Sequence, residues 1–248
     1  MGQVLHGSAT TTEAVRRSIQ HRQESLRALA KRYGINPKTV AKKKFKVYPI
    51  GFFHIDIAEV QTAGGRLYLF VAIDRTSKFA FVELHSKAAR RVAADFLRNL
   101  ADAVPHKINT ILADNGTHVT DPAGGGWSVS DIKAMRAEGV LFRCHSFDAA
   151  CADLDIEHRL TKPAHPWTNG QVERMNRTIK EATVKRDHDE DHAQLRQHLD
   201  HFIAADNFCR RLKTLKGLTP YEFICKQWTK EPERFRFNPI HQMQGLNI

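Results

Sequence analysis

The order of apolar runs and turn signals between residues 50 and 114 restricts the fold more than any other feature of the sequence. The runs IGFFHIDIAEV, RLYLFVAID and FAFVELH are separated by the turn signals TAGG and RTSK. Short, apolar, β-rich runs with such turns between them are typical of antiparallel strands. We therefore predict a three-stranded antiparallel meander.

The next segment, KAARRVAADFLRNLADAV, repeats apolar residues at helical spacing, and INTILADNG follows as a short buried run ending at Asp114. A helix between two strands indicates a crossover to a parallel neighbour. Farther along, FDAACADL indicates a short helix and IEHRLT another strand. This order predicts the α/β class, with a mixed sheet and flanking helices.

The remaining segments indicate helices and one flexible loop. The Gly-rich stretch DPAGGGWS precedes an expected inserted helix over residues 131–140. Amphipathic patterns predict a long helix over about residues 171–186 and a second over about residues 194–212. In TPYEFICKQW, Thr219 and Pro220 suit the cap and first position of a further helix, and the chain thus ends in a helical tail.

Positive charge is concentrated at one end of the chain. The formal net charge is +11, and residues 1–48 contain eleven Lys or Arg but only two Glu. Such a balance favours a polyanionic partner such as DNA. The sequence has no apolar run long enough to span a bilayer and no secretory pattern at its start, so we expect a cytoplasmic, nucleoid-associated protein without a membrane partner.

The basic first segment predicts a small all-α helix-turn-helix module. It shows three helical patterns, and Gly34 suits the end of the second. A third helix beginning near Asn36 would act as a recognition helix in the major groove. An alternative is a small helical bundle with a merely basic surface. The residues expected to touch DNA are Lys38, Thr39, Lys42 and Lys43.

Three carboxylates carry the chemical interest of the remaining chain. Asp56 lies within an apolar strand, where an unpaired carboxylate is costly, so it needs a cation or an Arg as partner. Asp114 ends a strand at the edge where open α/β sheets place functional groups, although for Asp114 taken alone an ordinary Asp-Asn-Gly turn is the better explanation. Glu173 falls in the first turn of a helix, where the dipole favours an acid without any catalysis.

Taken together, the three acids predict a metal-dependent site. The order of strands and helices can bring Asp56, Asp114 and Glu173 to one edge of the sheet, where they would repel one another without divalent cations. Mg²⁺ prefers oxygen ligands and binds through carboxylates and substrate phosphates. Two such ions can activate the attacking oxygen and stabilise the leaving oxygen of an in-line phosphoryl transfer.

The sequence also resembles a known family. HIDIAEV, ILADNGTH and PAHPWTNGQVERMNRTIKEA are similar to the three signature blocks of the integrase catalytic core of retroviral integrases and bacterial insertion-sequence DDE transposases. The resemblance covers about residues 50–226, and the tail LKGLTPYEFICKQWTKEPERF resembles that of the insertion-sequence enzymes. It implies a ribonuclease-H-like fold in which Asp56, Asp114 and Glu173 are catalytic and bind two Mg²⁺ or Mn²⁺ ions.

The implied reactions are hydrolysis at the ends of a mobile element and attack of the freed 3′-OH on target DNA. The implied partners are double-stranded DNA, as element ends and target, and further copies of the chain. The resemblance adds DNA-binding residues on the helix after Glu173, which otherwise form a solvated face: Arg174, Asn176, Arg177 and Lys180. It also adds residues that support the site: Asn115, Gly116, Asn169 and Gly170. His54 shares a strand face with Asp56 and could support the site as well, although a satisfied core histidine is the better explanation.

Four segments are expected. They are a helix-turn-helix module over residues 1–44, a basic linker over 45–49, the catalytic core over 50–188 and a helical extension over 189–248.

Two departures from the family pattern stand out. The stretch between Asp114 and Glu173 is longer than in retroviral integrases, and the excess maps to the Gly-rich loop and the helix after it. GINPKTVAK also passes directly into KKFKVYPIG, where the relatives carry a further DNA-binding segment, which indicates an internal deletion at residues 42–44. Two alternatives therefore stay open: a DNA-binding remnant that inhibits full-length transposase, and a structure-selective nuclease without strand transfer.

Overall fold

The computed structural model describes residues 24–36, 48–62, 64–121, 127–161, 170–182 and 192–242. The chain divides into two compact units: the first ends at Val47 and the second begins at Tyr48. The finer division into linker, core and extension stays a prediction. In the described part of the chain, no helix is long and apolar enough to cross a membrane.

The described part of the first unit contains one short helix. α2 (Leu26–Tyr33) begins at Ser25, whose hydroxyl accepts a hydrogen bond from the Ala28 N–H at 3.2 Å, and it ends at Gly34 with φ 60°. This confirms Gly34 as the residue that ends the second predicted helix, because glycine adopts a positive φ without steric cost. The other two predicted helices, including Lys38, Thr39, Lys42 and Lys43, lie outside the described residues.

The second unit is built on a five-stranded mixed sheet with the strand order β3-β2-β1-β4-β5. The predicted antiparallel meander is confirmed, as is the parallel pairing of the next strand with the first. The last strand is parallel to its neighbour as well. The strands are β1 (Phe52–Thr62), β2 (Gly65–Asp74), β3 (Ala80–His85), β4 (Thr110–Ala113) and β5 (Glu157–Leu160).

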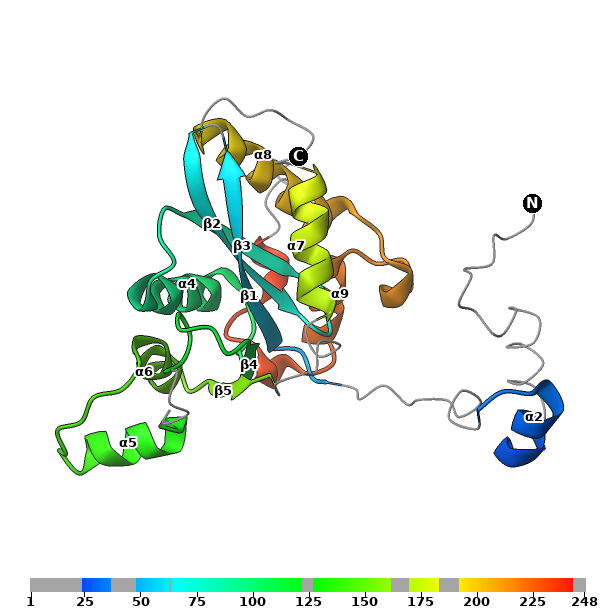
Figure 1. The fold of residues 1–248 in the computed structure, drawn as a ribbon, viewed down its shortest axis with the longest axis horizontal. Helices are drawn as coiled ribbons and strands as arrows, with labels where there is room; N and C mark the ends of the chain where they lie inside the picture. The colour runs from blue at the N-terminus through cyan, green and yellow to red at the C-terminus, as the bar shows by residue number, and fades with distance from the viewer. Residues whose placement is uncertain are drawn as a thin grey trace. The chain divides into compact units, whose positions relative to one another are not determined.

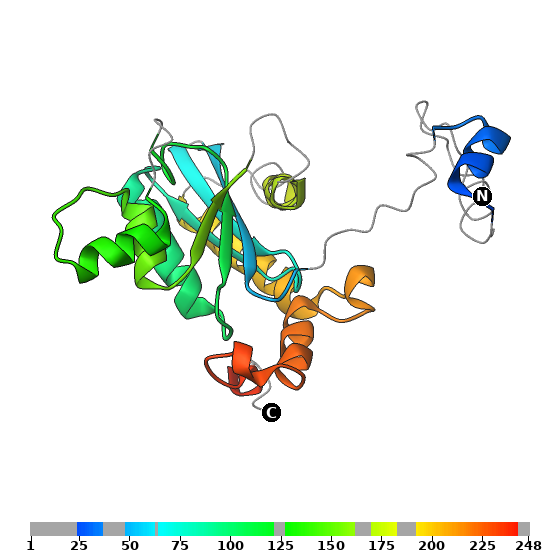
Figure 2. The same ribbon diagram turned by 90° about the horizontal axis from the view of Figure 1, so that it is seen from below.

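Helices cover both faces of this sheet (Figures 1 and 2). α4 (Arg90–Ala103) and α6 (Ser146–Asp153) pack on one face through a large apolar cluster that includes Phe53, Ile111 and Phe96. On the opposite face, α7 (Gly170–Ala182) and α8 (His192–Ala204) form a second cluster with β2 residues. The inserted helix is observed as α5 (Val129–Ala137), and the helix with the Thr219 cap as α9 (Pro220–Trp228).

The second C-terminal helix ends earlier than its pattern predicts. α8 stops at Ala204 and continues as one π-helical turn, η2 (Ala205–Cys209), so the helix does not reach Leu212. The reason is a tertiary contact of Asn207, which is 2% exposed. Its amide accepts from the Ala80 N–H at 2.9 Å and donates to the Ala80 carbonyl at 2.8 Å. Holding this side chain against β3 forces the helix to widen and stop.

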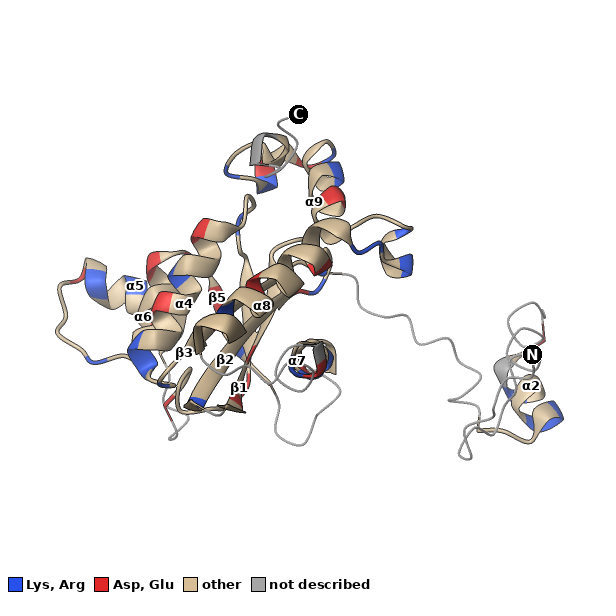
Figure 3. Ribbon diagram, turned by 90° about the horizontal axis from the view of Figure 1, so that it is seen from above, with Lys and Arg blue, Asp and Glu red and all other residues tan. Residues whose placement is uncertain are grey.

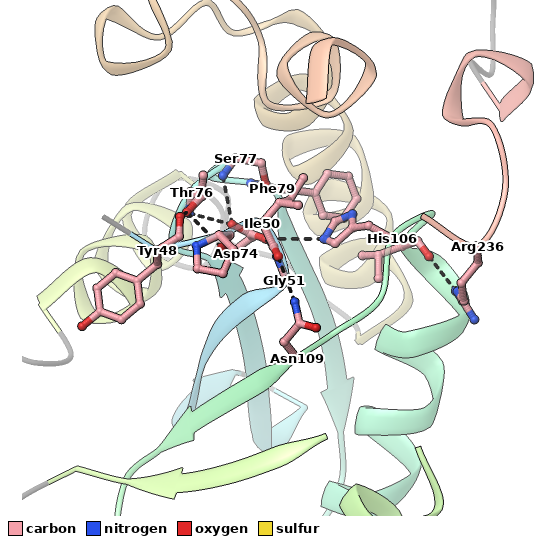
Figure 4. A network of polar contacts seen from close by, with 12 residues as sticks. Tyr48, Ile50, Gly51, Asp74, Thr76, Ser77, Phe79, His106, Asn109 and Arg236 are labelled. Atoms are coloured by element: carbon pink, nitrogen blue, oxygen red, sulfur yellow. Dashed lines mark hydrogen bonds and ion pairs between the residues drawn. The ribbon is translucent and has the colours of Figure 1, made fainter. Parts of the chain in front are cut away.

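A polar network joins the start of β1, the turn after β2 and the segment before β4 (Figure 4). The Asp74 side chain is fully buried and accepts from the Gly51 N–H at 2.7 Å. His106 Nε2 lies 3.4 Å from the same carboxylate. The Gly51 carbonyl in turn accepts from the Asn109 N–H at 2.9 Å. These contacts hold the first residues of β1 and β4 side by side. The residues farther along the two strands are aligned as a result.

Candidate active site

Strand register brings the two aspartates together. His54 of β1 pairs with Leu112 of the parallel β4, and Asp56 and Asp114 each lie two residues farther along. Because side chains alternate between the faces of a sheet, residues two apart lie on the same face. Asp56 and Asp114 therefore occupy neighbouring positions on one face, at the carboxyl end of β4.

The third acid reaches this face from α7. Val172, Met175 and Ile179, all at most 9% exposed, pack against the sheet on the face of Asp56. Glu173 lies in the first turn of α7, as predicted, and is exposed at the rim of this contact. The helical period thus seats α7 on the sheet, and Glu173 lies near enough for its charge to act on the Asp56 carboxyl.

Hydrogen bonds and neighbouring charges set the state of Asp56. Its Oδ1 accepts from the Ile57 N–H at 3.0 Å, and its Oδ2 accepts from the amide of Asn176. Burial raises the pKa of Asp56, the charge of Asp114 raises it further, and Glu173 acts in the same direction; the two hydrogen bonds oppose this shift. The charges of Asp114 and Glu173 therefore both act on the Asp56 carboxyl. Among the described residues, the side-chain partner of Asp56 is the amide of Asn176 rather than an Arg, and a bound cation stays a prediction.

Asp114 also forms an Asp-Asn-Gly turn, which was the alternative explanation for an acid at this position. Its Oδ1 accepts from the Gly116 N–H at 3.0 Å, and Asn115 donates from its amide to the Thr161 carbonyl at 3.1 Å. Both Asp114 and Asn115 are exposed. The Asp-Asn-Gly segment is thus a turn tied to the end of β5, and this turn holds the Asp114 carboxylate on the side of Asp56.

His54 lies on the face of the aspartates but is not a satisfied core histidine. It is 1% exposed, and its Nδ1 has no hydrogen-bond partner within the described residues. Its Nε2 lies 3.4 Å from Nη1 of Arg75. Burial lowers the pKa of His54 to about 4, and the positive charges of Arg75 and Lys78 contribute in the same direction. His54 is therefore neutral at physiological pH.

The predicted DNA-binding residues of α7 separate into two groups. Arg174 and Arg177 are exposed, and α7 carries both basic and acidic positions in Figure 3. Lys180 donates to the Glu59 carbonyl at 2.8 Å. Asn176, in contrast, is 6% exposed and faces Asp56 rather than solvent. Its spacing of four residues from Val172 was a signal for this inward orientation.

One predicted supporting residue, Gly170, is the first residue of α7, and a Cβ added there would meet none of the described atoms within 4 Å. Asn169 lies outside the described residues. Sequence reasoning missed Arg75, because the RTSK segment indicated only a turn.

The donor set suits a hard divalent cation. Asp56, Asp114 and Glu173 offer only oxygen ligands, which Mg²⁺ and Mn²⁺ prefer. Burial raises the pKa of Asp56, and the charges of Asp114 and Glu173 raise it further, so a cation beside these carboxylates would stabilise the ionised form of Asp56. Within the described ranges, however, no three His, Cys, Asp or Glu side chains lie close enough together to hold an ion.

The strand order and the helices on both faces of the sheet define a ribonuclease-H-like fold. Residues 48–166 match the integrase core domain family, and residues 154–220 match a second family of the same description. The two matches together cover more than half of the chain. The chain therefore belongs to the integrase core superfamily, and these matches support a transposase- or integrase-type function.

Solved structures share this fold. The catalytic core domain of BIV integrase superposes with a TM-score of 0.51 at 18% identity, covering 73% of this chain and 97% of that one. A chain of the simian T-cell lymphotropic virus intasome in complex with PP2A regulatory subunit B56 gamma gives a TM-score of 0.54 at 16% identity, covering 84% and 73%. At these identities the likeness establishes the fold alone. A search of curated proteins found no match.

Proposed function

We propose that this chain is the DNA-cleaving and strand-joining enzyme of an insertion sequence. It would hydrolyse the ends of the element and transfer the freed 3′-OH to target DNA. The observation that supports the proposal is the electrostatic contact of three acids from β1, the end of β4 and α7: burial raises the pKa of Asp56, and the charges of Asp114 and Glu173 raise it further.

The three carboxylates are the proposed ligands of Mg²⁺ or Mn²⁺. Bound there, two divalent ions supply Lewis-acid stabilisation of the charge that develops in phosphoryl transfer. The chain's own groups orient the ligands: the Asn176 amide fixes one oxygen of Asp56, and the Gly116 N–H fixes one oxygen of Asp114. These contacts support a site whose ligand directions are set before substrate binds.

DNA is the proposed substrate and partner. The exposed guanidinium groups of Arg174 and Arg177 lie on the same helix as Glu173, and one of the similar solved structures is an intasome. We propose that these side chains and Lys180 hold the DNA backbone beside the acids, and that several copies of the chain act together on DNA. The basic residues 1–44 are the proposed reader of the element ends, as a helix-turn-helix.

The test compares two glutamates of the same helix. Purified protein is incubated with labelled DNA from the flanks of its coding region, a plasmid target and Mg²⁺ or Mn²⁺. Glu173→Gln is expected to abolish nicking and joining. Glu181→Gln, two turns away and also exposed, is expected to leave both unchanged.

The outcomes separate the alternatives. Equal nicking and joining by wild type and Glu173→Gln would show that the triad assignment is wrong. Cleavage without joining identifies a nuclease. DNA binding that is unaffected by Asp56→Asn, without cleavage in either metal, identifies a DNA-binding remnant.

A further inference from the structure

The turn between β2 and β3 is held rigidly against the segment that precedes β1. Besides the Gly51 N–H, the buried Asp74 carboxylate accepts from the N–H groups of Thr76 at 2.6 Å and Ser77 at 2.9 Å (Figure 4). The Thr76 hydroxyl donates to the Tyr48 carbonyl at 2.7 Å. Because its backbone is bonded at several points, the turn presents its side chains in a fixed arrangement.

This turn carries two half-buried cations, Arg75 and Lys78. The Lys78 ammonium donates to the Arg75 carbonyl, and the Arg75 guanidinium lies over the Tyr48 ring, 4.4 Å from its centroid. Arg75 is thus held by a cation–π contact and by its contact with His54. Within the described ranges, neither cation forms an ion pair with a carboxylate.

Within the described part of the chain, these two positive charges are only partly balanced by an anion. Burial lowers the pKa of Lys78; the charge of Asp74 raises it, and that of Arg75 lowers it again. Asp74 compensates only in part, because backbone N–H groups occupy its oxygens. Two adjacent cations that are partly removed from water favour an anionic ligand.

The register of the sheet places this pair next to the candidate active site. Asp56 pairs with Val71, and Asp74 lies three residues farther along β2, about 10 Å away at roughly 3.3 Å per residue. Arg75 contacts His54, which shares a sheet face with Asp56. A DNA strand covers about 10 Å of helix axis within roughly three nucleotides. One strand can therefore reach both places.

We propose that Arg75 and Lys78 form a binding site for a backbone phosphate of the DNA strand whose reacting phosphodiester lies at Asp56. Arg is suited to this role because its planar guanidinium can donate two parallel hydrogen bonds to a phosphate. Lys78 adds a point charge, and the Tyr48 ring fixes the guanidinium beforehand. This inference rests on the proposed function, because it takes DNA as the substrate.

The test measures binding of the full chain to a short fluorescein-labelled DNA duplex by anisotropy, in EDTA and over a series of salt concentrations. Arg75→Gln/Lys78→Gln is compared with Lys87→Gln/Arg91→Gln, which removes the same charges from exposed positions at and before α4, on the other face of the sheet. Each lost phosphate contact lowers the slope of log K against log salt by about 0.9. We expect the Arg75/Lys78 variant to lose about one unit of slope and the control variant none.

Two single variants guard against misfolding. Lys78→Gln removes only a side chain that reaches the Arg75 carbonyl, and it is expected to lower affinity while the thermal midpoint is retained. Arg75→Lys keeps the charge, so we expect the slope to remain while affinity falls with the loss of the planar donor. Equal slopes and affinities for the Arg75/Lys78 and control variants would overturn the proposal, as would a wild type that does not bind DNA.

DNA cleavage assays test the proposed function separately from the binding measurements that test the phosphate site. A wild type that never cuts DNA in Mg²⁺ or Mn²⁺ contradicts the proposed reaction, and the slope difference can persist in that case. A wild type that cuts DNA while all slopes are equal contradicts only the phosphate site.

Discussion

Asn176 provides the sharpest test of how the site is held together. Asn176→Ala removes the amide that donates to Asp56 Oδ2. A hydrogen bond to a charged group contributes about 1.5–3 kcal/mol. Every ~1.4 kcal/mol of lost transition-state stabilisation lowers a rate about tenfold. If the amide orients Asp56 throughout the reaction, we expect DNA cleavage to become about 10- to 100-fold slower.

We expect Asn176→Ala to change the free energy of unfolding by less than it changes the activation free energy of DNA cleavage. The same substitution removes the Asn176 Oδ1 atom, which is buried without a hydrogen-bond partner within the described residues. Removing an unsatisfied buried acceptor returns about 1–3 kcal/mol and offsets most of the lost bond. The expected net change is therefore under about 2 kcal/mol, measured by urea unfolding with tryptophan fluorescence.

The pH dependence identifies Asp56 as the group affected. Because its folded pKa lies above its unfolded value, ionised Asp56 lowers stability, and stability falls as pH rises through the window between the two values. Deleting the amide raises the folded pKa further. The variant should therefore be closest to wild type below about pH 4, where Asp56 is protonated in both states, and should fall behind as pH rises.

A matched control separates this effect from the general loss of an amide. Asn99 donates from its amide to a Glu83 oxygen at 2.8 Å, but this pair is exposed on the outer surface. Asn99→Ala should change stability by no more than about 0.5 kcal/mol and leave cleavage unaffected. Full activity of Asn176→Ala, with a stability loss independent of pH, would refute the reasoning.

Three further substitutions test other parts of the structure. Asp56→Asn should raise the thermal midpoint of the metal-free protein at neutral pH, because it removes a disfavoured charge. The increase in midpoint should vanish at acid pH, where Asp56 of the wild type is protonated. A midpoint below that of wild type at neutral pH would contradict this expectation. Gly51→Ala should lower the free energy of unfolding in urea by about 3 kcal/mol or more, because φ is +91° and the new Cβ would lie 2.2 Å from the Lys107 carbonyl oxygen. A loss under about 1 kcal/mol would refute this close approach. Asn207→Ala should cost about 2–4 kcal/mol by leaving both backbone groups of Ala80 unpaired, and an unchanged urea midpoint would show that water replaces the amide.

Local patterns predicted most of the sheet and helices because the apolar residues of each element recur at the spacing typical of that element. The meander, the crossover to β4 and the helix carrying Glu173 follow from alternation, turn residues and helical spacing. The end of α8 did not follow, because it depends on a contact between Asn207 and a strand 127 residues earlier in the chain. No window of sequence contains both partners.

The candidate site was predictable to a similar degree. The positions of Asp56, Asp114 and Glu173 follow from element order, but the inward orientation of Asn176 needed the α7 period to be applied beyond its apolar residues. Arg75 gave no local signal, since its contact with His54 arises from the pairing of β1 with β2. Side chains that meet through sheet register are visible only once the register is known.

The contact of Asn207 with Ala80 has a consequence for where this chain can be cut. An amide side chain occupies the outer hydrogen-bonding groups of β3 as a further strand would, and unpaired strand edges invite association with other chains. Leu195, Leu199 and Ile224, from the same C-terminal segment, complete both apolar clusters. A fragment ending near residue 188 would therefore expose an unpaired strand edge and two incomplete cores, and we expect it to aggregate on expression.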